Sequence, residues 1–230
     1  MIKMKAEVFR RLVLLALFNE NNGEIKTKTE LQKLPFFLEK EIHEKNFTAL
    51  PYSYMNYHHG PYSEDLYDDV NFLTTLGLLD IDSSKIDLIH ENRVTKSTKY
   101  ELTELGKEAA NSAAAFIELI APTLYNSIKE TVHNFGGKTA TQLKNLSHET
   151  DEYKNTEFES VIFAGVEPNS IVESDVEWEE LEQKLDLEVL DNIEELIQVL
   201  DSDFEEFLNI TQEELEQTDY ESLNSQLIND

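Results

Sequence analysis

Three short stretches of the sequence hold residue types that could carry out chemistry, and each lacks a group that the chemistry requires. Gly137-Lys138-Thr139 resembles the end of a phosphate-binding loop, but Val132 stands where the first glycine of such a loop belongs. His58 and His59 are adjacent, so on a strand their side chains point to opposite faces and cannot chelate one metal ion. His148-Glu149 lacks the second histidine of a zinc protease motif. We therefore expect no metal and no cofactor.

The sequence also holds no local signature of an activated nucleophile or of a catalytic acid and base. No serine stands in a nucleophile elbow or beside a base in a known motif. Carboxylate pairs carry little information, because the chain has 47 Asp and Glu among 230 residues and chance alone would bring many of them together. We expect a protein that is not an enzyme.

Charge is the strongest compositional signal, and it is unevenly distributed. The formal net charge is −28; residues 1–155 contribute −5 and residues 156–230 contribute −23, with a single lysine in the second part. Such a balance argues against binding to nucleic acid or to an anionic membrane, because phosphate groups are bound by clustered Lys and Arg. A basic protein partner is the better expectation.

The remaining composition is that of an ordinary soluble protein. Cysteine is absent, so disulfides and thiolate zinc sites are excluded. The longest apolar run, Leu12 to Phe18, is far shorter than the roughly 20 residues that span a bilayer. We therefore expect a cytoplasmic protein.

The apolar periodicity predicts alternating helices and short strands that would position any functional group. Helices are predicted over 4–18, 29–44, 63–76 and 104–120, and an aromatic strand over 51–59 that is stopped by Gly60-Pro61. Further strands are predicted over 78–81, 86–89 and 99–102, with a turn at Ser83-Ser84. Three helices followed by a β ribbon and a helix is the order of a winged helix-turn-helix. The predicted fold class is α+β, mainly α.

The third predicted helix is unsuited to reading DNA. In DNA-binding winged helices this element enters the major groove and offers basic or amide side chains to the bases. Here it carries Glu64, Asp65, Asp68 and Asp69 and no Lys or Arg. The wing does carry Lys85, Arg93, Lys96 and Lys99, so a winged-helix transcriptional regulator stays an alternative.

Several motifs resemble a known family in their order and spacing. They are Leu31-Gln32-Lys33-Leu34, His59-Gly60-Pro61-Tyr62-Ser63-Glu64-Asp65-Leu66, Leu76-Gly77-Leu78-Leu79 and a segment from Gly136 that ends in Leu146-Ser147-His148. Over residues 8–155 the chain resembles the Panacea domain of SocA-like antitoxins. The resemblance implies a protein-binding module that neutralises a toxin by direct contact.

The same motifs also have a purely structural interpretation. Gly60 permits a tight turn, Pro61 presets the start of the next helix, and Ser63 caps that helix. The tyrosines at 52, 54, 57 and 62 would form either part of the core or a recognition surface. Both interpretations stay open.

The acidic C-terminal part is predicted to be helical. Residues 156–172 resemble a linker, and residues 173–230 carry two capping-box patterns, Ser174 with Glu177 and Thr211 with Glu214, and an apolar stripe from Leu181 to Leu208. Either the apolar face docks on the first domain and the carboxylates are merely solvated, or the anionic face receives a basic partner. A third possibility is mimicry of DNA by an anti-defence inhibitor, which would need several such helices side by side.

These arguments give one candidate set of partner-binding residues in each part of the chain. The first domain contributes Tyr57, His59, Tyr62, Asp65, Asp68 and Asp69, and the acidic extension contributes Trp178, Glu179, Glu182, Glu194, Glu195 and Glu205. The predicted function is that of an antitoxin-like protein whose acidic C-terminal surface serves a basic partner.

Overall fold

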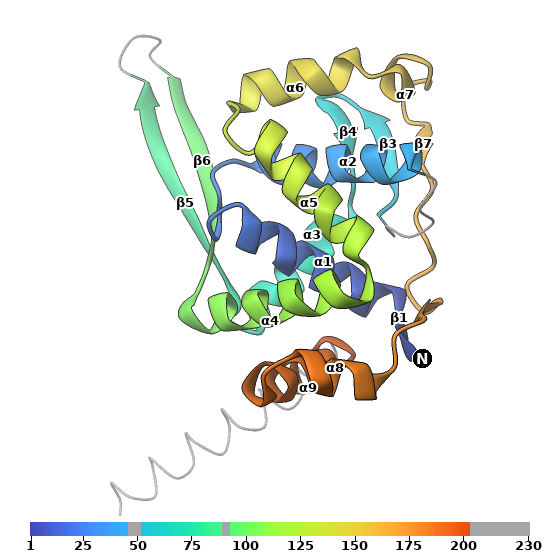
Figure 1. The fold of residues 1–230 in the computed structure, drawn as a ribbon. Helices are drawn as coiled ribbons and strands as arrows, with labels where there is room; N and C mark the ends of the chain where they lie inside the picture. Colours follow the sequence, from blue (N-terminus) through green and yellow to red (C-terminus); the bar gives the residue numbers. More distant parts are fainter. Residues whose placement is uncertain (46–51, 89–92, 203–230) are drawn as a thin grey trace, which may run out of the picture.

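The computed structural model describes residues 1–45, 52–88 and 93–202, and its class is α+β with helices in the majority (Figure 1). This confirms the fold class predicted from the sequence. Among the residues that the structure describes, no helix is both long and apolar enough to cross a membrane.

Helices α1 (Ala6–Glu20) and α2 (Lys28–Glu44) form the centre of the molecule. Every residue of α1 from Leu12 to Phe18 is buried, as is every residue of α2 from Glu30 to Glu39. The cap of α2 is Thr27, whose hydroxyl accepts a hydrogen bond from the Glu30 backbone at 3.0 Å. A helix buried on all sides lacks the one-sided stripe of a surface helix and must be enclosed by other elements.

A three-stranded antiparallel sheet follows α1 and α2. Its strands are β2 (Glu24–Ile25), β5 (Leu79–Leu88) and β6 (Arg93–Leu102), in the order β2-β6-β5. Helix α3 (Asp65–Thr75) precedes β5 and ends at Gly77, whose φ of +70° suits a glycine. The turn predicted at Ser83-Ser84 is wrong, because both serines lie inside β5 and pair with Thr98 and Ser97.

Two smaller pairings use the stretch that was expected to be a linker. Strands β3 (Tyr54–Tyr57), β4 (Gly60–Tyr62) and β7 (Val161–Phe163) form a sheet in the order β4-β3-β7. Strand β8 (Ile171–Ser174) pairs antiparallel with β1 (Ile2–Lys5) at the start of the chain. The linker prediction for residues 156–172 is therefore wrong: this stretch contributes two edge strands.

Four helices enclose the central pair. They are α4 (Glu104–Ile120), α5 (Pro122–Phe135), α6 (Ala140–Glu149) and the short α7 (Asp151–Lys154). Thr103 caps α4 as predicted, with its hydroxyl 2.9 Å from the Gly106 backbone nitrogen. Thr139 forms a capping box with Gln142 at the start of α6, which gives Gly137-Lys138-Thr139 a structural role.

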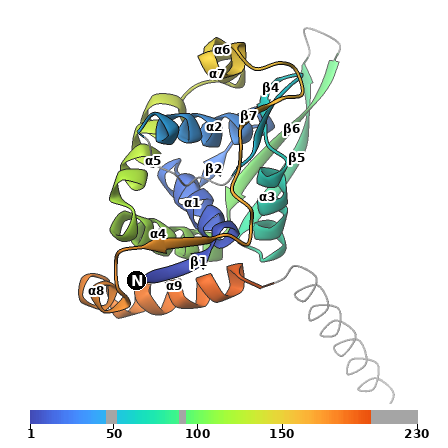
Figure 2. The ribbon, with the colours of Figure 1, turned by 90° about the vertical axis from the view of Figure 1, so that its right-hand side faces the viewer.

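The acidic helices α8 (Trp178–Lys184) and α9 (Leu187–Leu200) lie against α4 and the start of α1 (Figure 2). One face of α9 is buried through Leu190, Ile193, Leu196 and Leu200. Helix α8 begins after Glu177 without a side-chain cap, so the capping box predicted at Ser174 is wrong. The second predicted capping box, Thr211 with Glu214, lies outside the described residues. The apolar face of α9 thus docks on the rest of the molecule.

Candidate protein-binding surface

Three of the four motif segments on which the family resemblance rests meet at one junction between α2, β4 and α6. The Gln32 amide bonds the Ser63 backbone in both directions: its nitrogen donates to the Ser63 carbonyl and its oxygen accepts from the Ser63 N–H, each at 2.8 Å. The next residue, Lys33, is 2% exposed and donates from Nζ to the Pro61 carbonyl at 2.6 Å. Successive side chains of α2 thus hold the strand that follows Gly60.

His148 completes the junction from α6. Gly60 has a φ of +92°, and a Cβ atom at this residue would lie 2.8 Å from His148 Nε2 and 3.1 Å from Lys33 Nζ. The His148 ring stacks on Tyr153 with centroids 4.6 Å apart. Within the described part of the chain, His148 Nε2 has no hydrogen-bond partner. The motif residues therefore pack closely on one another. The predicted role of Pro61 at the start of a helix is wrong, because Pro61 lies in β4 and α3 begins only at Asp65.

Burial changes the acid–base behaviour of this junction. It lowers the pKa of Lys33 to about 7, with nearby Lys144 adding to the effect. It also lowers the pKa of His148, again with Lys144 and then Lys33 contributing. Because Gln32 and Lys33 are buried and bond the backbone of the segment that follows Gly60, we treat the junction as a support for the neighbouring hairpin.

The hairpin of β3 and β4 and the nearby Phe158 form a partly exposed group of rings in contact. This aromatic surface consists of Tyr57, His58, Tyr62 and Phe158. The Tyr57 centroid lies 4.7 Å from His58, 5.6 Å from Tyr62 and 6.0 Å from Phe158, and His58 lies 4.8 Å from Phe158. Tyr57 is 40% exposed and Phe158 is 51% exposed. Rings this large are normally buried unless they meet a partner.

Strand alternation explains why half of the predicted tyrosine cluster faces solvent. Tyr54 and Asn56 point inward and are buried, whereas Met55 and Tyr57 point outward. Tyr52 is also buried. Tyr52 and Tyr54 therefore belong to the core, whereas Tyr57 and Tyr62 lie at the surface.

Apolar and acidic side chains border the aromatic surface. Met55 and Val161, from paired residues of β3 and β7, are 37% and 55% exposed. Burial raises the pKa of Tyr62, and the negative charges of Glu64 and Asp68 add to that effect, which places both carboxylates near its hydroxyl. Glu64 and Asp68 are exposed. The surface thus combines a ring-lined centre with an anionic margin.

Asp69 does not belong to this surface, contrary to the prediction. Its carboxylate is completely buried and is paired with Arg10 and Arg11, the latter at 3.1 Å, and it accepts a hydrogen bond from the Tyr52 hydroxyl at 2.9 Å. Burial is the largest single influence and lowers the pKa of Arg10, but the charges of Asp69, Tyr52 and Asp65 and the hydrogen bond to Asp69 together raise it by more, so the net shift is upward. Asp69 is the inward residue of α3, one position away from exposed Asp68.

The other predicted residues of the first domain lie nearby with different exposure. His59 is exposed in the turn between β3 and β4. Asp65 is half-buried at the start of α3 and accepts a 3.3 Å hydrogen bond from the Ser53 backbone, so it has a structural task. The structure therefore brings Tyr57, His59, Tyr62 and Asp68 together as candidates for direct contact.

The predicted residues of the acidic extension lie elsewhere, on α8 and α9. These helices and the β3–β4 hairpin occupy opposite ends of the molecule (Figure 1). Glu179, Glu182, Glu194 and Glu195 are exposed, as predicted for a contact surface. Trp178 is only partly exposed, because its ring stacks on Phe116 with centroids 6.2 Å apart. Glu205 lies outside the described residues.

Arg11 fixes the docked position of α9. Its guanidinium donates to the Leu200 carbonyl at 2.6 Å, bonds Asp69 and lies 3.8 Å from the Phe72 ring centroid. A cation at the carboxyl end of a helix also interacts favourably with the helix dipole. One buried side chain therefore connects α1, α3 and the end of α9.

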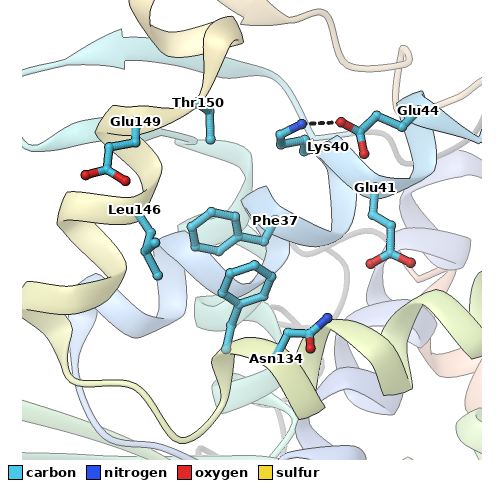
Figure 3. A pocket seen from close by; sticks show the side chains of 9 residues that line it. Phe37, Lys40, Glu41, Glu44, Asn134, Leu146, Glu149 and Thr150 are labelled. Carbon is cyan, nitrogen blue, oxygen red and sulfur yellow. Dashed lines mark hydrogen bonds and ion pairs between the residues drawn. The ribbon is translucent and has the colours of Figure 1, made fainter.

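A cleft of about 370 Å³ lies between α2, α5 and α6 (Figure 3). The Phe37 ring lines it and stacks on Phe135 with centroids 4.0 Å apart. Its charged groups are largely paired: Lys40 pairs with Glu44, and Glu41 pairs with Lys45 at 2.6 Å. Because these charges are already compensated, we assign this cleft no ligand.

Four residues of the aromatic surface and its border were not predicted as contact residues from the sequence: Met55, His58, Phe158 and Val161. Phe158 and Val161 fall in the stretch that was expected to be a linker, where large apolar residues were the only available signal. Among the residues that the structure describes, no group of three or more His, Asp and Glu is arranged to hold a metal ion. Comparisons with protein-family models, curated proteins and solved structures find no match.

Proposed function

We propose that this protein is a non-enzymatic, antitoxin-like protein that binds and neutralises a basic protein partner by direct contact. The observation that carries the proposal is the aromatic surface: Tyr57 contacts the rings of His58, Tyr62 and Phe158 and stacks on the last of these. Tyr57 is 40% exposed and Phe158 is 51% exposed, and the hairpin that carries Tyr57 is held by buried side-chain hydrogen bonds. Rigid aromatic side chains supply much of the binding energy at protein interfaces. The neighbouring carboxylates would favour a partner with a basic rim.

The arrangement of the motifs supports the resemblance to Panacea-domain antitoxins. Gln32 and Lys33 contact the Pro61-Tyr62-Ser63 segment directly, and His148 closes on Gly60 from a helix almost ninety residues further along the chain. Residues that depend on one another in this way are expected to occur together in a sequence. Their joint occurrence is thus explained by one packing arrangement.

The first half of the chain also supports a winged-helix architecture used for something other than reading DNA. Helices α1, α2 and α3 precede the long β5–β6 hairpin, and β2 adds a third strand in the order β2-β6-β5. Helix α3 exposes Asp68 and contains neither Lys nor Arg. Lys99, at the base of the hairpin, pairs with Glu24 and Glu101, each at 2.8 Å, so its charge is compensated.

Co-expression with the protein encoded by the neighbouring gene tests this function. We expect the full chain to restore growth of cells that express that protein and to co-purify with it. Tyr57→Ala and Phe158→Ala should each weaken binding by about 10- to 100-fold, as truncation of a central aromatic contact does. Leu187→Ala is the matched control, because Leu187 is 74% exposed on α9 at the other end of the molecule.

Three outcomes would contradict the proposal. Equal affinity of the parent, Tyr57→Ala and Phe158→Ala proteins would remove the aromatic surface from the interface. Tight binding to duplex DNA at physiological salt would favour a transcriptional regulator. Purification with a nuclease, without neutralisation of a neighbouring toxin, would favour a DNA-mimicking inhibitor.

A further inference from the structure

A second surface, distinct from the aromatic one, lies where the start of α4 faces the end of α9. This α4–α9 groove has a volume of about 320 Å³. Its walls are Leu105 and Ala109 of α4 and Leu196 and Val199 of α9, with Leu76 and Leu78 beneath. Leu105 is 56% exposed and Val199 is 42% exposed. The docking of α9 therefore leaves an apolar channel between two helices.

The spacing of the wall residues matches recognition of a helix. Leu105 and Ala109 are four residues apart on α4, and Asn192, Leu196 and Val199 are spaced by four and three on α9. Each set forms one stripe along its helix. Two facing helical stripes create a groove that accepts the apolar face of a third helix, as amphipathic helices are bound in other proteins.

The charged residues around the groove indicate which charge a bound helix would carry. Glu108 and Glu195 line its edges, and both are exposed. The nearest lysine in the sequence of α4, Lys107, is paired with Glu104 at 2.6 Å. A bound helix would therefore be favoured by Lys or Arg on either side of its apolar stripe.

The same charges disfavour occupation by the C-terminal part of this chain. Residues 203–230 contain nine Asp and Glu and neither Lys nor Arg. An acidic segment would bring like charges to Glu108 and Glu195, which raises the free energy of the bound state. Charge complementarity points instead to a helix from another protein.

We infer that the α4–α9 groove binds a basic amphipathic helix of the partner. The inference rests on the proposed function and deepens it, because it names the element of the partner that this end of the molecule would receive. The partner would then be bound at two separate surfaces, one aromatic and one helical.

A synthetic helix tests the groove without knowledge of the natural partner. The probe is a peptide of about 18 residues, long enough for helix formation, with Leu at helical spacing and Lys on both flanks. Fluorescence anisotropy with the full-length chain measures its affinity. We expect binding that weakens with salt, and a loss of at least about 10-fold in affinity for Glu195→Lys and for Val199→Lys.

Matched control variants on α9 test whether a loss of peptide binding is specific to the groove. Asp191→Lys makes the same charge change at an exposed residue of α9 that does not line the groove, and Leu187→Lys replaces an exposed apolar residue outside the groove. Both should bind the peptide within about 2- to 3-fold of the parent, apart from a shared effect of net charge. A peptide with Glu in place of Lys should not bind.

Several results would overturn the inference. These are failure of the Lys peptide to bind, equal binding of the Glu peptide, or equal losses for Asp191→Lys and Glu195→Lys. Contacts between the methyl groups of Leu196 or Val199 and those of residues 203–230, seen by nuclear Overhauser effects in the free protein, would identify the chain itself as the occupant and also overturn it.

The two proposals can fail separately. If the toxin is neutralised and the groove variants are as active as the parent, the groove inference is wrong and the function stands. If the peptide binds in the groove but no toxin is neutralised, the groove stands and the antitoxin function is wrong.

Discussion

At the scale of single residues, the two least exposed ionisable side chains of helix α2 are of opposite kind. Lys33 is 2% exposed and Glu39 is 1% exposed. Lys33 donates to the Pro61 carbonyl, whereas Glu39 Oε1 lies 3.4 Å from His43 Nε2, and within the described part of the chain Glu39 Oε2 has no partner. Burial lowers the pKa of Lys33 to about 7 and raises the pKa of Glu39 to about 9. Each group thus favours its neutral form in the folded protein.

Replacing Glu39 with glutamine should stabilise the protein at neutral pH. The folded protein keeps this carboxyl protonated up to about pH 9, whereas the unfolded chain ionises it near its ordinary pKa of 4.5. Its favourable contribution is fully present below pH 4.5 and is lost as the pH rises through 9. At pH 7 we expect Glu39→Gln to raise the free energy of unfolding by about 3 kcal/mol, measured by urea denaturation.

The pH trend distinguishes this effect from simple repacking. The difference in unfolding free energy between Glu39→Gln and the parent should shrink toward pH 4.5. Lys33 contributes an opposite pH trend above pH 7, but it does so in both proteins, so its effect cancels in the comparison. Glu44→Gln, at a side chain that is 62% exposed on the same helix, should change stability by less than about 0.5 kcal/mol at any pH. Equal stability of the parent and Glu39→Gln at pH 7 would show that Glu39 is ionised in the fold.

Alanine substitutions at two glycines with similar backbone geometry distinguish the cost of backbone strain from the cost of a steric clash. Gly60 and Gly77 have φ values of +92° and +70°, but only at Gly60 would a Cβ atom meet other atoms, namely His148 and Lys33. Gly77→Ala should therefore cost about 1 kcal/mol from backbone strain alone. Gly60→Ala should cost about 1 to 2 kcal/mol more, because the junction must move apart.

Thermal and urea unfolding of the two alanine variants measure this difference. The double variant Gly60→Ala/His148→Ala should recover part of the added loss, since it removes the ring that the new methyl group meets. Equal losses at Gly60 and Gly77 would mean that the junction is looser than its distances indicate.

Residue types alone could predict only part of the candidate surface. Tyr57, Tyr62 and Asp68 were identified from the sequence and do lie near one another, because the β3–β4 hairpin and the start of α3 are close in sequence. The inward orientation of Asp69 depends on Arg10 and Arg11 of α1, and nothing in the sequence around Asp69 shows that pairing. Phe158 joins Tyr57 from about one hundred residues away, and no local pattern specifies that contact.

At the scale of elements, helices were predictable where their own periodicity specifies them. The helix predicted over 104–120 agrees with α4, and the one predicted over 29–44 agrees with α2 to within one residue. The short strands β1, β7 and β8 were missed, because each consists of three or four residues and forms only against a distant partner. The predicted helix over 4–18 accordingly absorbed two residues that belong to β1, Met4 and Lys5.

The docking of α9 could be predicted from its sequence only as one of three alternatives. Its apolar stripe required a partner surface, and α4 and α1 supply one. The stripe did not reveal that Arg11 would hold the final carbonyl of the helix. Docking and an anionic outer face turn out to be compatible, since the buried and exposed residues of α9 lie on opposite sides.

At the scale of the whole molecule, the acidic part cannot be removed as a separate domain. A chain that ends at residue 155 would lose β7, β8, α8 and α9, and with them the cover of Ile2, Tyr54 and the outer side of α4. We expect such a protein to aggregate or to unfold without a cooperative transition, because this loss exposes apolar side chains and two strand edges. Size-exclusion chromatography and thermal unfolding monitored by circular dichroism measure both properties.

Substitutions within the full chain provide the matched comparison. Exchanging the exposed carboxylates Glu179, Glu182 and Glu194 for glutamine removes negative charge without removing any packed element. This variant should unfold cooperatively, near the temperature of the parent. A soluble, cooperatively folded chain of residues 1–155 would contradict the view that the two parts form one folding unit.

The pairing of β1 with β8 also means that β1 can reach its final position only late in the synthesis of the chain. Residues 2–5 are made first, yet their partners, residues 171–174, follow about 170 residues later. At roughly 5 to 20 residues per second, the ribosome takes on the order of 10 to 30 s to supply them. During that interval Ile2 and Met4, both buried in the finished protein, have no strand to pair with. The first segment to emerge is thus among the last to reach its final position.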